Sequence, residues 1–335
     1  MVASTRSALS IQPSRHRSPK RRTPVVSIVV TTHNEGVELR RTLASIRDNT
    51  RVPHEVIVVD DGSSDGSCSG IEDLCVRVLR HSERIGVAAS RNQGARVASA
   101  ETLCFLDAHQ RLSPGCIDQC VEVAQQRESI VSPNVRGYGC LSATTYGAKF
   151  RLCPKNGYFS AIWKLRRPRC RVTQSTTLRA PGYVMPRSIY ERVYWSSHLR
   201  GWGASEAAVA VKAFFQGIDI LQLHGPVARH RFRRKFPYRT SWESVWLNHG
   251  IVARVCFERR TWEDYWLPEV FAKNLSPLSL CILESSPIDS EHTTFQRTKV
   301  REDSSFWTEL LGVAAPVRAA KARAFGQQVQ QRLVR

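Results

Sequence analysis

The sequence has no long apolar run. Nowhere in its 335 residues do the roughly 20 consecutive apolar residues occur that a helix needs to span a bilayer. The first 24 residues also lack the apolar core of a secretory signal. Cysteine is sparse, with 10 residues and no Cys-x-x-Cys pair, which argues against a disulfide scaffold and against a four-cysteine zinc site. We therefore expect a cytoplasmic protein whose reduced thiols pack in its core.

Negative charge is scarce as well. The chain carries 49 Lys and Arg against 29 Asp and Glu, so its formal net charge is +20. A positive field of this size favours polyanions, phosphorylated ligands or acidic surfaces, with which we expect a peripheral association. No zinc-finger or RNP-like motif is present, and we expect no nucleic-acid partner. Three stretches contain several arginines and no acid, namely RHRSPKRR near the N-terminus and residues 164–172 and 228–235.

What the sequence does contain is an alternation of apolar strands and helices. A continuous apolar run begins at Val25, helical spacing follows over 37–49, and a second apolar run, EVIVVDD, ends in acids. A weak strand over 76–79, a helix of small residues from Gly86 and the strand LCFLD follow. This order predicts an α/β fold with a mostly parallel, Rossmann-like sheet covered by helices, and ligands at the carboxyl ends of the strands.

The second half of the chain is less regular. Residues 136–180 predict irregular structure or an antiparallel extension, before a helix from Ser205 to Gly217 and a strand over 218–223. Four tryptophans between residues 240 and 272 indicate helices that cap the domain. We expect a disordered basic tail over 1–24, one domain over 25–240, a helical extension over 241–285, and a peripheral, partly disordered tail over 286–335.

The stretch TLCFLDAHQRLSPGCID presents an acid and an imidazole where an apolar strand ends. In an extended segment, Asp107 and His109 point the same way, so a carboxylate oxygen and an imidazole nitrogen can converge on one point. This is a metal-ligand geometry if a third ligand exists. The alternative is that both side chains cap the loop before a helix that begins near Ser113-Pro114.

An ordered set of motifs resembles a known family. The stretches VSIVVTTHNEG, EVIVVDDGSSDGS, ERIGVAASRNQGA and FLDAH resemble family 2 glycosyltransferases of the GT-A fold. Asp-x-His, GWGASE and HRFRRKFPY narrow the likeness to the catalytic domain of polypeptide N-acetylgalactosaminyltransferases, up to about residue 266. The resemblance implies transfer of a sugar, such as GalNAc or GlcNAc, from UDP to a hydroxyl acceptor.

The resemblance also implies a metal centre. It places a third ligand at His230, beside Asp107 and His109, and mixed carboxylate and imidazole ligation suits Mn²⁺. A divalent cation stabilises the negative charge of the departing diphosphate, so Asp107 counts as catalytic as well as a ligand. The alternative for His230 is a surface histidine in a basic run.

The same resemblance assigns the nucleotide pocket. Asp60 is expected to accept the uracil N–H, and its alternative is a turn-forming acid in DDGSSDG, as for Asp61 and Asp65. Arg84 and Arg91 have a solvated helix face as their alternative. The other side chains expected around the nucleotide and its diphosphate are Thr31, Glu35, Arg84, Arg91, Arg233 and Tyr238.

Glu206 in GWGASE is the remaining catalytic candidate. The resemblance places an acidic residue of this loop against the sugar or the acceptor, and the acidic pair common in the family is Glu206-Ala207 here. An inverting transferase needs a carboxylate base, whereas a retaining one does not, so the stereochemistry stays open. A helix N-cap role is the alternative. The acceptor also stays open between a peptide Ser or Thr, a glycan and a small molecule. An inactive scaffold of the same fold that binds partners is an alternative function.

Overall fold

The computed structural model describes residues 23–316 except 140, 154, 179, 235 and 237. Residues 1–22 of the expected basic tail and residues 317–335 lie outside this part of the chain. The strands are β1 (Val26–Thr32), β2 (His54–Asp60), β3 (Arg77–Arg80), β4 (Thr102–Asp107), β5 (Gln110–Leu112), β6 (Ile130–Gly139), β7 (Thr144–Thr145), β8 (Ala148–Cys153), β9 (Tyr158–Trp163), β10 (Val172–Ser175), β11 (Tyr183–Pro186) and β12 (Ile220–Phe232). The helices are α1 (Val37–Asn49), η1 (Glu72–Leu74), α2 (Val87–Val97), α3 (Cys116–Arg127), α4 (Arg187–Val193), α5 (Ser205–Phe215), α6 (Trp242–Cys256), α7 (Arg259–Thr261), η2 (Trp262–Phe271), α8 (Pro277–Leu283), α9 (Ser286–Thr298), α10 (Asp303–Ser305) and η3 (Phe306–Leu311).

One large sheet organises the molecule. Its strand order is β10-β12-β6-β11-β4-β1-β2-β3, with β5 paired to β12 and β7 to β6. The β1-β2, β1-β4, β2-β3 and β6-β12 pairs are parallel, whereas β11 runs antiparallel to both β4 and β6. The expected α/β fold with a mostly parallel sheet is therefore present, and the β8-β9 hairpin supplies the antiparallel extension.

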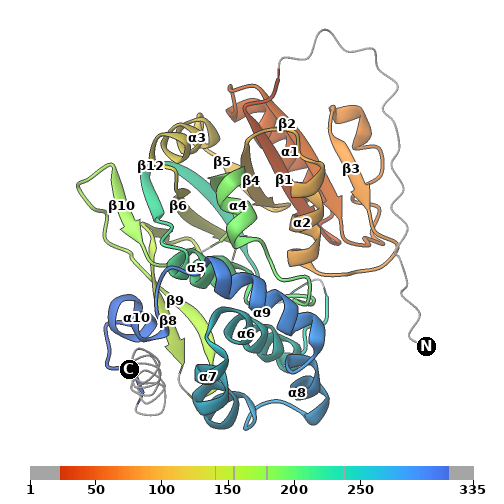
Figure 1. Cartoon of the computed structure of the whole chain (residues 1–335). Helices are drawn as coiled ribbons and strands as arrows, with labels where there is room; N and C mark the ends of the chain where they lie inside the picture. The colour runs from red at the N-terminus through yellow and green to blue at the C-terminus, as the bar shows by residue number, and fades with distance from the viewer. Residues whose placement is uncertain are drawn as a thin grey trace.

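Helices cover both faces of this sheet (Figure 1). The burial of β1 is complete along its length, as expected for a central strand with a layer on each side. Helix α2 packs against β1 at Gly94, where an added Cβ would lie 2.3 Å from a methyl group of Val29. The glycine therefore permits the close helix–sheet contact that the small-residue composition predicts.

The C-terminal helices form a second layer below the sheet in Figure 1. Helix α6 packs on α5 and α9, and its buried side chains join those of η2 and η3 in one hydrophobic cluster. Among these, Trp262, Trp266 and Phe306 have no exposed surface. Of the helices that the structure describes, none combines the length and apolar character that a bilayer crossing requires.

The expectation of a peripheral, partly disordered tail after residue 285 is wrong for residues 286–311. Helix α9 buries Ile288 and Phe295, and η3 places Phe306 and Trp307 in the core. The segment carries few apolar residues, widely spaced among polar ones, so its sequence resembles a solvated tail. The Lys212–Glu291 ion pair, 3.1 Å long and buried, fixes α9 to α5.

Candidate functional site

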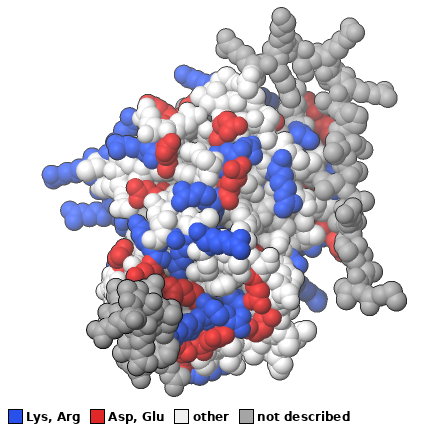
Figure 2. Space-filling model, viewed as in Figure 1, with Lys and Arg blue, Asp and Glu red and all other residues white. Residues whose placement is uncertain are grey.

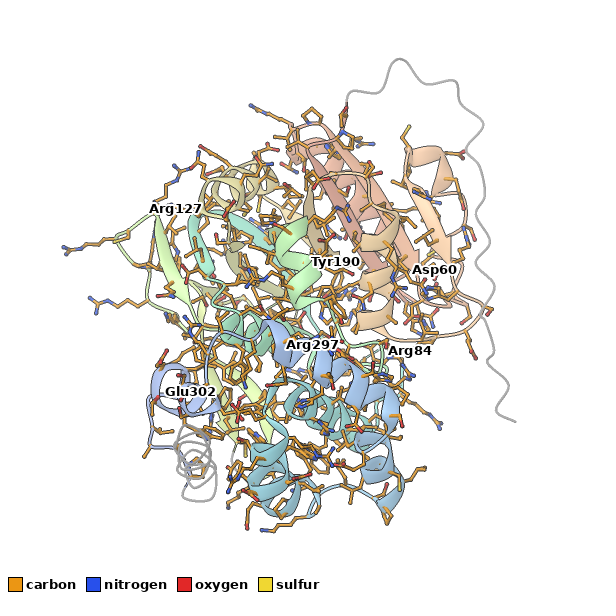
Figure 3. The ribbon with its side chains drawn as sticks, in the orientation of Figure 1. Asp60, Arg84, Arg127, Tyr190, Arg297 and Glu302 are labelled. Carbon is orange, nitrogen blue, oxygen red and sulfur yellow. The ribbon has the colours of Figure 1, made fainter. Side chains whose placement is uncertain are left out.

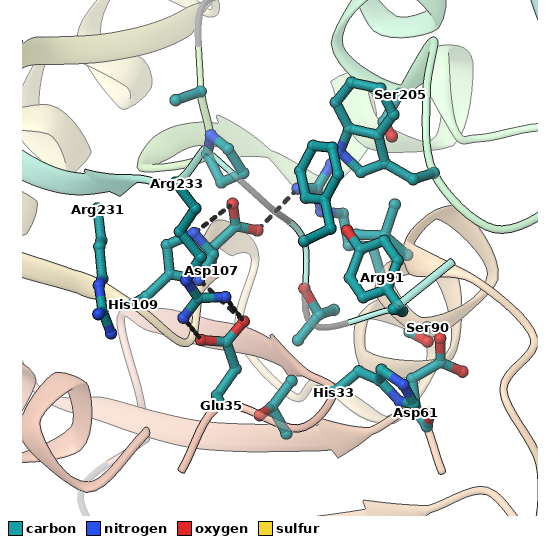
Figure 4. A pocket seen from close by; sticks show the side chains of 18 of the residues that line it. His33, Glu35, Asp61, Ser90, Arg91, Asp107, His109, Ser205, Arg231 and Arg233 are labelled. Carbon is teal, nitrogen blue, oxygen red and sulfur yellow. Dashed lines mark hydrogen bonds and ion pairs between the residues drawn. The ribbon is translucent and has the colours of Figure 1, made fainter. Parts of the chain in front are cut away.

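Loops at the carboxyl ends of β1, β2 and β4 border a cavity of about 290 Å³. The parallel strands place their ends at one edge of the sheet, where polar side chains of distant segments meet (Figure 4). Of the residues predicted from the sequence, those that line the cavity are Thr31, Glu35, Arg84, Arg91, Asp107, His109, Glu206, His230, Arg233 and Tyr238. Asp60 is the exception.

Asp107, His109 and His230 form the cluster that the sequence predicts. One ligand atom from each lies within 4.8 Å of the other two, and this is a group that could hold a metal ion. The His230 Nε2 atom lies 3.3 Å from the Asp107 Oδ2 atom, and the two imidazole rings are 4.7 Å apart. One carboxylate oxygen and two imidazole nitrogens are a donor set that suits Mn²⁺.

Strand β12 brings His230 to this position. The sequence predicts a short strand over 218–223 and a return loop, but β12 continues to Phe232 after an irregularity between Leu223 and Val227. His230 is therefore held in a strand, in register with Gln110 of β5 and Gly137 of β6. A ligand on a paired strand has less freedom than one on a loop.

The loop-capping alternative for Asp107 does not match its contacts. The buried side chain of Gln110 accepts a hydrogen bond from the Asp107 backbone N–H and donates to the carbonyl of Pro181, so Gln110 closes the turn. The Asp107 carboxylate instead faces Arg91 and His230. Its oxygens therefore lie where a cation can reach them.

Arg91 links the two carboxylates that the sequence singles out. Its buried guanidinium donates to Asp107 over 3.2 Å and to Glu206 over 2.9 Å. Burial by itself would raise the pKa of Asp107, but the hydrogen bond with His230 and the charge of Arg91 lower it. Arg91 lies beneath the site and does not form a solvated helix face, so it positions both acids.

Glu35 and Arg233 form a second linked pair (Figure 4). Both guanidinium Nη atoms of Arg233 bond the carboxylate of Glu35, one of them over 2.9 Å. The His109 Nδ1 atom lies 3.2 Å from the same carboxylate, which orients the imidazole. Burial would raise the pKa of Glu35, but hydrogen bonds with His109 and Arg233 lower it. The sequence predicts that the guanidinium of Arg233 binds the diphosphate. In this structure the guanidinium bonds Glu35 instead.

Asp61 lines the cavity, whereas its neighbour Asp60, the acid expected there from the sequence, does not. Asp60 at the end of β2 (Figure 3) caps the backbone N–H of Ser63 and approaches Arg80, because successive side chains of a strand point to opposite faces. Asp61 lines the cavity and accepts hydrogen bonds from His81 and from two backbone N–H groups. Burial would raise the pKa of Asp61, but these bonds lower it.

Arg84, Tyr238 and Phe236 form one wall of the cavity. The guanidinium carbon of Arg84 lies 3.9 Å from the centroid of the Tyr238 ring, and that ring stacks on Phe236 at 5.4 Å. Burial raises the pKa of Tyr238 to about 12, so the phenol stays neutral. His33, whose ring lies 5.8 Å from that of Tyr238, completes the wall, and its Nδ1–H donates to the carbonyl oxygen of Asp61.

Glu206 lies in the first turn of α5 and faces the cavity. The residue before the helix, Ala204, has a φ of 63°, and no side chain caps the helix start, which argues against the N-cap alternative for Glu206. The preceding loop crosses α2 closely, since a Cβ on Gly86 would lie 2.5 Å from the backbone nitrogen of Gly201. Two glycines at this crossing let the GWGASE loop approach the sheet edge.

Several cavity residues escaped the sequence analysis. His33, Ser90 and Trp202 line the cavity, and His81 holds Asp61 from behind. His33 stands between Thr31 and Glu35 in a motif already singled out, so its position was a usable signal. Trp202 and Ser90 stand likewise inside GWGASE and ERIGVAASRNQGA, but their residue types alone indicate no role at a site.

Comparison with known proteins supplies a family. The model of the family described as "Glycosyl transferase family 2" matches residues 27–194, which is half of the chain. Polypeptide N-acetylgalactosaminyltransferase 8 of Drosophila melanogaster is 26% identical over 257 residues, covering 67% of this chain and 42% of the relative. This chain thus spans about two fifths of the length of that relative.

Solved structures match the fold. A crystal structure of GalNAc-T7 with UDP, GalNAc and Mn²⁺ has a TM-score of 0.68 and 18% identity, over 86% of this chain and 57% of that one. S. aureus TarS 1-349 in complex with UDP-GlcNAc has a TM-score of 0.51 and 16% identity, over 85% of this chain and 76% of that one. At these identities the likeness establishes a shared fold.

Proposed function

This chain belongs to glycosyl transferase family 2, and from that premise we propose that it transfers a sugar from a UDP-sugar to a hydroxyl group with the help of a divalent cation. One observation carries the proposal: Asp107, His109 and His230 converge on one point, in the same cavity as Asp61. A metal-ligand cluster beside a nucleotide-sized cavity supports transfer from a nucleotide sugar.

The donor atoms fit Mn²⁺. Asp107 offers an oxygen, His109 and His230 offer nitrogens, and the lowered pKa of Asp107 keeps the carboxylate ionised. A bound cation would offset the negative charge that grows on the leaving diphosphate. Glu35 orients His109, and Arg91 orients Asp107. The GalNAc-T7 structure, which carries UDP and Mn²⁺, supports this choice of cofactor.

Asp61 is our candidate for the acid that selects uracil. Three of the roughly four acceptor positions of its carboxylate are taken by His81, Ile85 N–H and Gly86 N–H, which leaves one for a further N–H donor. The base would lie near Thr31, beside the wall that His33, Arg84 and Tyr238 form. Uracil offers an N–H at its edge, whereas cytosine offers an acceptor at the same place.

Glu206 would act on the sugar or the acceptor. Its side chain is 26% exposed at the cavity, and Arg91 holds one of its two carboxylate oxygens. The other oxygen is left to bond a hydroxyl of the sugar or to take the proton of an acceptor hydroxyl. A peptide Ser or Thr, a glycan and a small molecule are all acceptors of this chemistry.

Titration of the protein with UDP, with and without Mn²⁺, tests the proposal. We expect UDP to bind with Mn²⁺ and to bind far more weakly in EDTA. UDP-GalNAc and UDP-GlcNAc should then bind with different affinities, which would name the donor. Equal affinity for UDP in EDTA and in Mn²⁺ would refute the metal role, and no binding in either would refute the nucleotide site.

A further inference from the structure

A second cavity, of about 480 Å³, lies against strand β12. It takes side chains from β5, β6 and β12 and from the loop after β9, and its lining contains no acidic residue. Arg229 of β12 faces this cavity, whereas its neighbour His230 faces the metal-ligand cluster. Both cavities therefore border β12, the second at Val227 and Arg229 and the first from His230 onward.

The sheet register sets three arginines side by side in this cavity. Arg229 pairs directly with Arg111 of β5 on one side and with Arg136 of β6 on the other. Residues directly opposite on neighbouring strands have Cβ atoms about 5 Å apart. A fourth arginine, Arg167, reaches the same cavity from the loop between β9 and β10.

These arginines have little local compensation. Arg111 bonds Glu38 over 2.6 Å and is neutralised by it. No ion pair to a carboxylate of the described residues is made by Arg136, Arg167 or Arg229, all of which are exposed. Figure 2 shows further Lys and Arg side chains projecting from the edge of the molecule where Figure 1 places β10.

Such an arrangement costs stability unless an anion offsets it. Like charges directly opposite on neighbouring strands destabilise a sheet. The local positive potential also acts on His224, whose pKa is lowered first by burial and then by the charges of Arg167 and Lys164. An imidazole kept neutral in this way adds no charge of its own to the cavity.

We propose that the cavity formed by Arg111, Arg136, Arg167 and Arg229 binds a phosphate-type oxyanion. A guanidinium offers five N–H donors in a fixed fork that matches phosphate oxygens, and three such groups converge here without acids of their own. Thr144 and Tyr146 add hydroxyl groups to the lining. A single carboxylate would accept hydrogen bonds from one guanidinium, whereas the oxygens of a tetrahedral oxyanion can accept them from several.

Two sources carry this chemistry, a free phosphate and the headgroup of an anionic phospholipid. The end of β9 exposes Ile162 at 51%, and the loop that supplies Arg167 exposes Leu165 at 60%, beside Lys164. Exposed apolar side chains next to basic ones are a pattern found at membrane surfaces. The test therefore has one arm for each source.

The first arm is calorimetric titration with inorganic phosphate, in EDTA, of wild type and of the double variant Arg136→Gln/Arg229→Gln. We expect the variant to lose about tenfold or more in affinity, since charge-assisted hydrogen bonds are removed. Arg127→Gln is the matched control, because Arg127 is exposed at the far end of α3 (Figure 3), about 16 Å along the helix from Cys116, whereas the cavity lining ends at Pro114 before this helix. It should bind phosphate as wild type does.

The second arm is sedimentation with vesicles of phosphatidylcholine containing phosphatidylglycerol. Binding to these vesicles that the double variant loses and Arg127→Gln keeps identifies a lipid headgroup as a source. Phosphate binding without vesicle binding identifies a free phosphate. Wild type that binds neither probe, or a double variant that matches wild type with both, overturns the proposal.

Thermal melting checks that the double variant folds. Without phosphate its melting temperature should equal or exceed that of wild type, because cross-strand repulsion is relieved. Phosphate should raise the melting temperature of wild type only. Should the double variant not fold, Arg167→Gln in the loop serves instead, since it leaves the strands intact. UDP titration with Mn²⁺ reports on the first cavity independently of these results.

Discussion

The two cavities that border β12 differ in how their charges are balanced. In the first, buried cations and acids are bonded to each other, as in Arg91 with Asp107 and Glu206, and Arg233 with Glu35. In the second, Arg136, Arg167 and Arg229 have no acid in the lining. A cavity of linked opposite charges can hold a cation and an anion together, whereas a cavity of arginines alone suits an anion.

This difference predicts that ligand binding in the first cavity depends on a metal ion because acidic side chains line that cavity. Asp107→Ala removes one of three ligands and leaves Arg91 without that partner. We expect UDP affinity in Mn²⁺ to fall by about 100-fold or more, and the remaining binding to be insensitive to EDTA. Calorimetry measures both effects. An Asp107→Ala protein that keeps a strong response to Mn²⁺ would show that the cation binds elsewhere.

Glu206→Gln should separate transfer from binding. The amide keeps the shape of the side chain and still bonds Arg91 through its oxygen, but it cannot accept a proton. If Glu206 is the base, kcat falls by about 10²–10⁴-fold while UDP affinity is unchanged. Release of UDP from the UDP-sugar measures kcat. Unchanged kcat would remove the base role and favour a retaining reaction.

Asp61 and Asp60 form a matched pair of neighbouring acids. Asp61→Asn should weaken UDP by about 1–3 kcal/mol and reduce the preference for UDP over CDP, because an amide N–H₂ can bond the cytosine acceptor. Asp60→Asn should leave the UDP:CDP ratio unchanged, since Asp60 does not line the cavity. The reverse pattern in competition binding would restore Asp60 as the base-selecting acid.

The smallest expected effect is on stability. Burial lowers the pKa of His81, but its hydrogen bonds with Asp61 and Gln93 raise it above the ordinary 6.5 overall. A pKa raised by folding contributes stability that is present below about pH 6.5 and is lost as pH rises through the folded value. The melting temperature of wild type should therefore exceed that of His81→Gln most at low pH. A difference that stays constant from pH 5 to 9 would contradict this.

Much of the N-terminal half could be predicted from the sequence. Helix α1 begins and ends where its apolar spacing predicts, and the acids after β2 and β4 reach the expected edge of the sheet. Local patterns suffice there because each strand is followed directly by the residues that line the site. The Asp107 and His109 pair is of this kind.

Long-range contacts limited the rest. Either Asp60 or Asp61 can face the cavity, depending on the residue at which β2 ends, because successive side chains of a strand point to opposite faces. The composition of the segment does not determine this residue. The arginine row at Arg229 depends on the pairing of β5, β6 and β12, which lie far apart in sequence. The burial of Phe306 depends on a cluster assembled from several helices.

The most direct test of the metal site is anomalous diffraction from a crystal grown with Mn²⁺ and UDP. We predict one strong manganese peak about 2.0–2.3 Å from side-chain atoms of Asp107, His109 and His230, with phosphate oxygens of UDP completing its coordination. The base of UDP should lie within hydrogen-bond reach of Asp61. The account would be contradicted by a manganese ion that binds UDP and other side chains but leaves His230 outside its coordination sphere.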